Sequence, residues 1–112
     1  MRSRVFISTL VITAFAVLAP LLAATPAQAA TRRTWDRLAN CESSGRWHIN
    51  TGNGYYGGLQ FSGPTWRAFG GRKFGKNAHR ASKREQIRVA ERVRRNQGWG
   101  AWPSCSRRIG LR

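Results

Sequence analysis

The first helical pattern of hydrophobic and polar residues lies between residues 34 and 42. Trp35, Leu38 and Ala39 recur at the three- and four-residue spacing of one helix face, and Glu42 is the next residue on that face. A carboxyl group is therefore expected on the apolar side of a helix. Burial raises the pKa of a carboxyl group, which would allow Glu42 to donate a proton near neutral pH. The alternative is a fraying helix end at which Glu42 points into water.

A second amphipathic helix is predicted from residue 82 to about residue 97. Ser82 and Glu85 have the spacing of a capping box, and Gly98 marks the end of the helix. Its expected core face holds Gln86, Val89, Ala90, Val93 and Gln97. Gln97 is thus a second polar residue aligned with hydrophobic ones. The alternative is that Gln97 lies in the last turn and faces water.

Turn-forming residues dominate the segment between these helices. Residues 50–54 are rich in Asn and Gly, and the flanking segments 46–50 and 55–61 are predicted to pair as a short hairpin. The second segment contains Gly57 and Gly58, which weaken a strand but let a ligand or another backbone approach closely. A small sheet is therefore expected beside the helices.

The rest of the chain predicts one more short helix and a rigid tail. Pro64 suits a first helical turn and Gly70 ends that helix, after which residues 72–81 form a basic loop. An aromatic segment, residues 99–103, follows the second long helix, and the basic residues 107–112 are expected to fray. The fold class is therefore α+β and mainly helical, in one small domain.

Residues 1–29 have the features of a secretory signal peptide. Two arginines precede an apolar stretch, and residues 27–29 form an A-x-A processing site. We expect cleavage there, leaving residues 30–112 as a secreted, extracellular or wall-associated domain with no stable membrane insertion. The alternative is a retained membrane anchor at residues 5–22, which are about long enough to approach a bilayer span.

The chain is strongly basic, with 20 Lys and Arg against four Asp and Glu and a formal charge of +16. Loss of Arg2 and Arg4 with the signal would leave +14. Such a surface attracts polyanions. An exported chain without a recognisable nucleic-acid motif favours anionic cell-envelope polymers over nucleic acid, with exposed arginines contributing small, interchangeable amounts. The alternative is a solubilising surface that has no specific partner.

Two cysteines, Cys41 and Cys105, are present. An even number in an oxidising compartment predicts a disulfide bond, which would stabilise so small a domain by about 4 kcal/mol in the chain-entropy model. A metal site is disfavoured because His48 and His79 lie at no spacing typical of zinc ligands. Neither a metal nor an organic cofactor is implied.

Four short motifs follow one another along the chain: Cys41-Glu42-Ser43, residues 50–61 (NTGNGYYGGLQF), Thr65-Trp66 and residues 97–105 (QGWGAWPSC). In this order and spacing they resemble the core domain of the resuscitation-promoting factors. That family comprises secreted muralytic proteins with a lysozyme-like, lytic-transglycosylase-like fold. The resemblance covers about residues 35–106.

The resemblance implies roles for individual residues. Glu42 matches the catalytic acid, Thr65 and Gln97 match residues that contact substrate, and the family's disulfide matches Cys41 and Cys105. The chain departs from the family at Ser44, where Gly is common, so the turn behind Glu42 is expected to differ in conformation. We also expect no appended wall-binding module, with the positive charge serving in targeting instead.

Other residues are candidates for substrate binding because of their positions in these motifs. Gln60 is expected to line the cleft, with an ordinary strand position as the alternative. Tyr55, Trp66 and Trp99 are candidates to stack on sugar faces, with core packing as the alternative. Core packing is the prediction for the other three tryptophans, Trp35, Trp47 and Trp102.

Cleavage of a glycosidic bond usually takes two carboxyl groups, and this chain offers few. Asp36 lies about 120° from Glu42 around its helix, Glu85 belongs to the capping box, and Glu91 is predicted to project from the polar side of its helix. One acid is sufficient if the C6 hydroxyl of N-acetylmuramic acid attacks its own C1 and gives a 1,6-anhydro product. Attack by water is the alternative.

These observations predict a secreted enzyme that cleaves peptidoglycan between N-acetylmuramic acid and N-acetylglucosamine. Its role would be wall remodelling and growth resuscitation, with another wall hydrolase as a possible partner. Two other classes remain open. One is a non-catalytic wall-binding or signalling module, and the other is a cationic membrane-active peptide.

Overall fold

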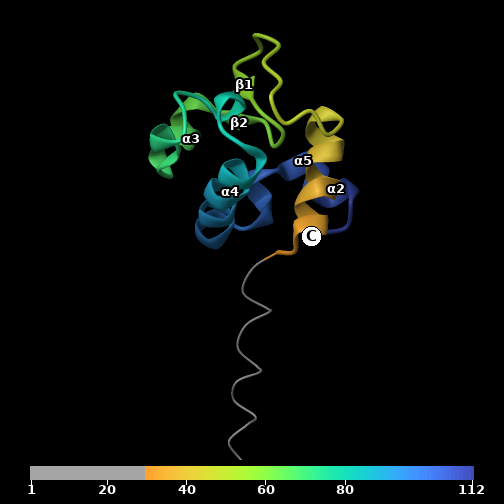
Figure 1. Ribbon diagram of the computed structural model, residues 1–112. Coiled ribbons are helices and arrows are strands. Elements are labelled where there is room, and N and C mark those ends of the chain that lie inside the picture. Colours follow the sequence, from red (N-terminus) through yellow and green to blue (C-terminus); the bar gives the residue numbers. More distant parts are fainter. Residues whose placement is uncertain (1–29) are drawn as a thin grey trace, which may run out of the picture.

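The two predicted long helices, α2 (Arg32–Ser43) and α4 (Lys83–Gln97), are both present in the computed structural model (Figure 1). The structure describes residues 30–112, and the predicted signal peptide, residues 1–29, lies outside the described residues. The other elements, in chain order, are β1 (Tyr55–Tyr56), β2 (Phe61–Ser62), α3 (Gly63–Ala68), the 3-10 turns η3 (Gly71–Lys73) and η4 (Ala78–Arg80), η5 (Trp99–Ala101) and α5 (Pro103–Arg108). The α+β, mainly helical class is confirmed.

Helix α2 has the predicted apolar face. Thr31 caps its start, where the Thr31 side chain accepts a hydrogen bond from Thr34 N at 3.2 Å. Trp35, Leu38 and Ala39 are completely buried. The helix ends at Ser44, which takes a left-handed conformation with φ of 59°. This is a conformation that favours glycine.

Helix α4 begins with the predicted capping box. Glu85 N donates to Ser82 Oγ at 3.1 Å, and Ser82 N donates to Glu85 Oε1 at 2.9 Å. Its buried residues are Gln86, Val89, Ala90 and Val93. The predicted core face is therefore confirmed for these four positions.

The hairpin exists, but its strands are not the predicted ones. Tyr55 pairs with Ser62 and Tyr56 with Phe61, so the chain reverses through residues 57–60. Segment 46–50 contributes only an isolated bridge, from Asn50 to Tyr56. The chain can reverse within these four residues because Gly57 and Gln60 both take positive φ, at 79° and 54°.

A buried glutamine holds this turn. Gln86 has no exposed surface, and its Oε1 accepts from Gly58 N at 3.0 Å while its Nε2 donates to Trp47 O at 2.8 Å and Ala81 O at 3.1 Å. A Cβ added at Gly57 would lie 2.4 Å from Gln86 Oε1, and one at Gly58 would lie 2.4 Å from the Trp47 ring. Glycine is therefore required at both positions for this packing.

Three tryptophans with buried rings connect the elements around the core. Trp35 Nε1 donates to Glu91 Oε2 at 2.8 Å, Trp66 Nε1 to Gly75 O at 2.9 Å, and Trp102 Nε1 to Leu59 O at 3.0 Å. Each indole thus fills the core and still satisfies its N–H. Core packing is confirmed for Trp35 and Trp102, and Trp47 is partly buried against the same core.

The carboxyl-terminal segment is ordered, so the prediction that residues 107–112 fray is wrong. Arg37 Nη2 donates to Ile109 O at 2.6 Å, and Arg112 Nε donates to Ser106 Oγ at 2.8 Å.

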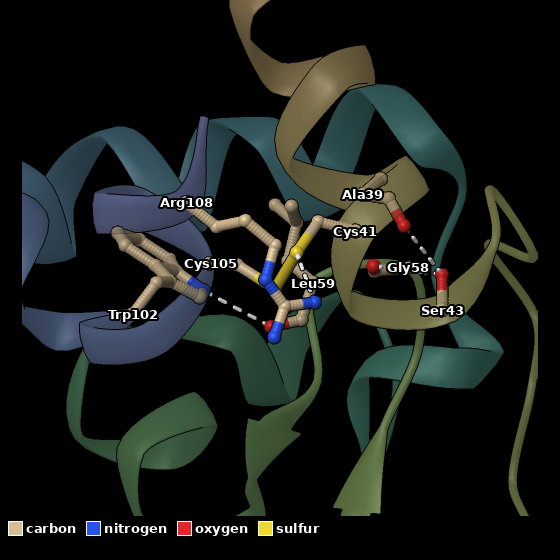
Figure 2. The surroundings of a disulfide bond; sticks show 8 residues. All are labelled: Ala39, Cys41, Ser43, Gly58, Leu59, Trp102, Cys105 and Arg108. Atoms are coloured by element: carbon tan, nitrogen blue, oxygen red, sulfur yellow. Dashed lines mark hydrogen bonds between the residues drawn. A yellow bond between two sulfur atoms is a disulfide. The ribbon is translucent and has the colours of Figure 1, made fainter. Parts of the chain in front are cut away.

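The predicted disulfide between Cys41 and Cys105 is present and joins α2 to α5, with a Cα separation of 5.8 Å (Figure 2). None of the helices in residues 30–112 is long and apolar enough to cross a membrane.

Ser44→Gly should stabilise the fold by about 0.5–1 kcal/mol. Glycine removes the steric cost that serine has in the left-handed conformation, and this gain exceeds the extra backbone entropy that glycine loses on folding. Thermal unfolding should show a higher melting temperature. Ser104→Gly is the matched control, because Ser104 lies in helix α5 and glycine there should lower stability. A lower melting temperature for Ser44→Gly would contradict the prediction.

Replacing Cys41 and Cys105 together with serine should destabilise the domain by up to about 4 kcal/mol, the chain-entropy value for a loop of 64 residues. Chemical denaturation of the double variant and of the oxidised protein measures this difference. Equal free energies of unfolding would show that the bond contributes no stability.

Candidate functional site

Two adjoining pockets form a cleft between the hairpin and the carboxyl-terminal segment. The first has a volume of about 220 Å³ and is lined by Tyr55, Gln60, Phe61, Ser62, Thr65, Val93, Gln97, Ala101 and Trp102. The second, of about 260 Å³, is lined by Glu42, Tyr55, Gln60, Ala101, Trp102 and Pro103. Four residues border both pockets, so Glu42 lies in one part of a continuous cleft and Thr65 and Gln97 lie in the other.

Glu42 has the environment expected of an acid. Its side chain is partly buried, and burial raises the pKa of its carboxyl group, while the nearby charge of Arg108 lowers that pKa to a smaller extent. Within residues 30–112 no hydrogen bond or salt bridge holds this carboxyl group. Figure 2 shows Arg108 beside the disulfide, with its Nη1 3.9 Å from Cys41 Sγ. The predicted direction of the pKa shift is confirmed.

The other three carboxyl groups of the chain are engaged outside the cleft. Glu85 is in the capping box, and Asp36 forms a salt bridge with Lys83 at 2.6 Å. The prediction that Glu91 projects from the polar side of α4 is wrong. Its Oε2 accepts hydrogen bonds from Trp35 Nε1 at 2.8 Å and from Ala30 N at 3.1 Å. Glu42 is therefore the one carboxyl side chain available to a molecule in the cleft.

Three predicted polar residues line the cleft beyond Glu42. Thr65 stands in the first turn of α3, where its N–H donates to the capping Ser62 Oγ at 3.2 Å. Gln97 is the last residue of α4 and is exposed, so it faces water and lines the cleft at the same time. Gln60 borders both pockets, and its Nε2 donates to Gly57 O at 3.1 Å. These three predicted positions are brought together.

The aromatic residues predicted to stack on sugars do not all line the cleft. Tyr55 is 49% exposed and borders both pockets, so its ring is available to a ligand. Trp66 has no exposed surface, and its predicted stacking on a sugar is wrong because the ring fills the core against Phe61. Trp99 lines neither pocket and packs on Trp35 with ring centroids 5.0 Å apart.

Several cleft residues were not predicted. Trp102 has a core position but one edge reaches both pockets, and Ala101 and Pro103 lie beside it. All three belong to the sequence motif at residues 97–105, which is the signal that could have identified them. Arg108 carries no such signal among so many arginines. In the part of the chain that the structure describes, no three His, Cys, Asp or Glu residues gather into a metal site.

Comparison with known proteins identifies the family of the domain that holds this cleft. The family model described as the transglycosylase-like domain matches residues 29–105. The chain belongs to this family. The matched range includes every residue that lines the cleft, and the family is consistent with the expected lysozyme-like fold.

Curated relatives carry the name of the resuscitation-promoting factors. Rpf1 of Corynebacterium glutamicum is 56% identical over 98 residues, covering 88% of this chain and 50% of that protein. Rpf of Micrococcus luteus is 60% identical over 86 residues, covering 77% of this chain and 37% of that protein. The chain thus spans half or less of the length of these relatives. The resemblance to the core domain of the resuscitation-promoting factors is confirmed.

Arg108→Met should raise the pKa of Glu42, because it removes the positive charge that stabilises the carboxylate while leaving the burial unchanged. An NMR titration of the Glu42 carboxyl carbon measures the shift. Arg107→Met is the charge-matched control and should leave the titration close to that of the unsubstituted protein. A Glu42 pKa that is equal or lower in Arg108→Met would show that Arg108 does not act on this group.

Proposed function

We propose that the domain cleaves the glycosidic bond between N-acetylmuramic acid and N-acetylglucosamine in peptidoglycan, with Glu42 as its single general acid. One observation carries the proposal. Within residues 30–112, Glu42 is the only carboxyl side chain at the cleft, and burial raises its pKa toward the range in which an acid stays protonated.

The reaction begins with proton transfer from the Glu42 carboxyl group to the glycosidic oxygen. The bond from C1 of N-acetylmuramic acid to that oxygen breaks, the leaving sugar departs as an alcohol, and positive charge develops at C1. Glu42 is then a carboxylate beside Arg108, whose charge stabilises it. The protein thus favours the protonated acid before the transfer and limits the cost of the carboxylate afterwards.

The nucleophile comes from outside the protein in this scheme. No second carboxyl side chain lines the cleft, so the covalent intermediate of a two-carboxylate enzyme has no candidate residue. The C6 hydroxyl of the same N-acetylmuramic acid closes on C1 to give a 1,6-anhydro ring, or water attacks to give the hydrolysed sugar. In both cases the Glu42 carboxylate accepts the proton of the attacking hydroxyl and is restored.

Substrate positioning falls to the other part of the cleft. Thr65, Gln97 and Gln60 offer hydroxyl and amide groups for the acetamido and hydroxyl groups of a glycan, and the exposed face of Tyr55 is suited to stack on a sugar ring. These contacts would fix the glycosidic oxygen beside Glu42, which is the main requirement for proton transfer.

The cellular role that we propose follows from the relatives' names and from the charge of the chain. The domain would be cleaved after Ala29, secreted or held at the cell wall, and used for wall remodelling and growth resuscitation. Its net positive charge would concentrate it near anionic envelope polymers. A second wall hydrolase is a possible partner, because the two enzymes would act on the same polymer.

Glu42→Gln should lower the rate of peptidoglycan solubilisation at least about a hundredfold, the usual effect of losing a general acid. The glutamine should leave the fold intact at neutral pH, since burial disfavours the charge that the substitution removes. Release of muropeptides, analysed by mass spectrometry, measures the rate and also distinguishes the 1,6-anhydro from the hydrolysed product.

Asp36→Asn is the control for this experiment, because Asp36 is an exposed carboxylate on the same helix and lies outside the cleft. It should solubilise peptidoglycan at nearly the unsubstituted rate. Turnover close to normal in a folded Glu42→Gln protein would exclude Glu42 as the acid.

A further inference from the structure

A cluster of unpaired positive charges lies outside the cleft, on the segment from α3 to η4. Arg67, Arg72, Lys76 and Arg80, here called the basic face, are all exposed. No Asp or Glu occurs between residues 43 and 84. Within residues 30–112, none of the four side chains makes a hydrogen bond or a salt bridge. Their charges are therefore available to an external anion.

The basic face lines two adjoining pockets. One, of about 440 Å³, is bordered by Arg67, Arg72 and Lys76. The other, of about 610 Å³, is bordered by Asn50, Tyr56, Gly75, Lys76, Asn77, His79 and Arg80. Lys76 borders both, so the two pockets form one extended surface. Such a surface is better suited to a chain with repeated charges than to a single small ion.

This surface lies on the other side of the hairpin from the cleft. Tyr55 borders the cleft, whereas its neighbour Tyr56 borders the second basic pocket. Successive residues of a strand point to opposite faces, which explains the separation. A ligand on the basic face therefore does not need to compete with a glycan in the cleft.

Two buried polar atoms near the basic face have no partner. Asn77 Oδ1 and His79 Nδ1 are buried without a hydrogen bond within residues 30–112. Burial, together with the charges of Arg80 and His48, lowers the pKa of His79, so its ring is neutral at pH 7. Asn77 Oδ1 can only accept a hydrogen bond, and the nitrogen of a neutral imidazole can also accept one. Both residues border the second basic pocket, so a ligand that turned these side chains outward and carried hydroxyl groups as well as negative charge would supply the missing partners.

Asn77, which borders the second basic pocket, also lies close to Arg67, which borders the first. A Cβ added at Gly63 would lie 3.0 Å from Arg67 Nη1 and 3.3 Å from Asn77 Oδ1, so a cation and an acceptor lie over the same glycine. Guanidinium groups bind phosphate oxygens in a planar, two-bonded geometry. Cations and hydrogen-bond acceptors on one surface thus match a polymer that carries both phosphates and hydroxylated carbons.

We propose that the basic face is a binding site for a polyol-phosphate polymer of the cell wall. This inference rests on the proposed action on peptidoglycan. It holds that four residues, and not the whole charged surface, attract the anionic polymers of the envelope. It would hold the enzyme at the wall while the cleft, on the other side of the hairpin, remains free for the glycan.

The surface is less suited to nucleic acid, which also carries phosphodiesters. Proteins that bind single strands stack bases on exposed aromatic rings. Tyr55 is the one exposed large hydrophobic residue in the part of the chain that the structure describes, and it borders the cleft. Tyr56, which borders the basic face, is stacked on the His79 ring with centroids 5.3 Å apart.

The test compares two triple variants of equal charge. Arg72→Gln/Lys76→Gln/Arg80→Gln removes three of the four charges of the basic face, and Arg32→Gln/Arg95→Gln/Arg107→Gln removes three exposed arginines that border none of the pockets described above. Binding of purified poly(glycerol phosphate) is measured by titration calorimetry at fixed ionic strength. The first variant should bind at least about tenfold more weakly than the protein itself, because each charged contact contributes strongly. The control should bind much more tightly than the first variant.

Equal losses in both variants would show that net charge alone attracts the polymer and would overturn the localised site. Equal or tighter binding of a polyuronate, or of single-stranded DNA with the same number of charges, would also overturn it. Cleavage of short soluble glycans by both variants should stay at the unsubstituted rate. That assay separates the two proposals, because loss of cleavage in Glu42→Gln tests the cleft without involving the basic face.

Discussion

The turn at residues 57–60 is held by hydrogen bonds from three separate parts of the chain, and the cleft depends on it. Gln86 on α4 binds Gly58 N, Ser43 at the end of α2 donates to Gly58 O at 2.9 Å, and Trp102 donates to Leu59 O. The turn carries Gln60 and follows strand β1, which holds Tyr55, so its position sets the hairpin wall of the cleft. A polar residue inside the core thus determines where the recognition groups lie.

Carboxyl groups are scarce in this chain, and their uses differ sharply. Asp36, Glu85 and Glu91 each have partners within the fold, through a salt bridge, a helix cap or indole and backbone donors. Glu42 is partly buried and makes no hydrogen bond within residues 30–112; burial raises the pKa of its carboxyl group, and the nearby charge of Arg108 only partly offsets that effect. The difference in surroundings therefore separates the one acid that we propose to be catalytic from three that serve the fold.

Periodicity and capping signals predicted the parts of the fold that are set locally. The faces of α2 and α4, the Ser82 cap and the location of Glu42 all follow from spacing within a single helix. The strand pairing, the burial of Trp66 and the partners of Gln86 depend on contacts between residues far apart in the chain, and no spacing encodes them. Gln86 was placed on the core face correctly, yet its role was visible only once Gly58 lay beside it.

The bond between Glu91 and Ala30 N has a consequence for maturation. In a chain that still carries its signal, Ala30 N is a neutral amide donating to Glu91 Oε2. Cleavage after Ala29, as proposed, would turn the same nitrogen into the terminal ammonium group and the bond into an ion pair. Charge-assisted hydrogen bonds are roughly twice as strong as neutral ones. Processing would then tighten the start of α2 against α4, so that the exported form is held more firmly than its precursor.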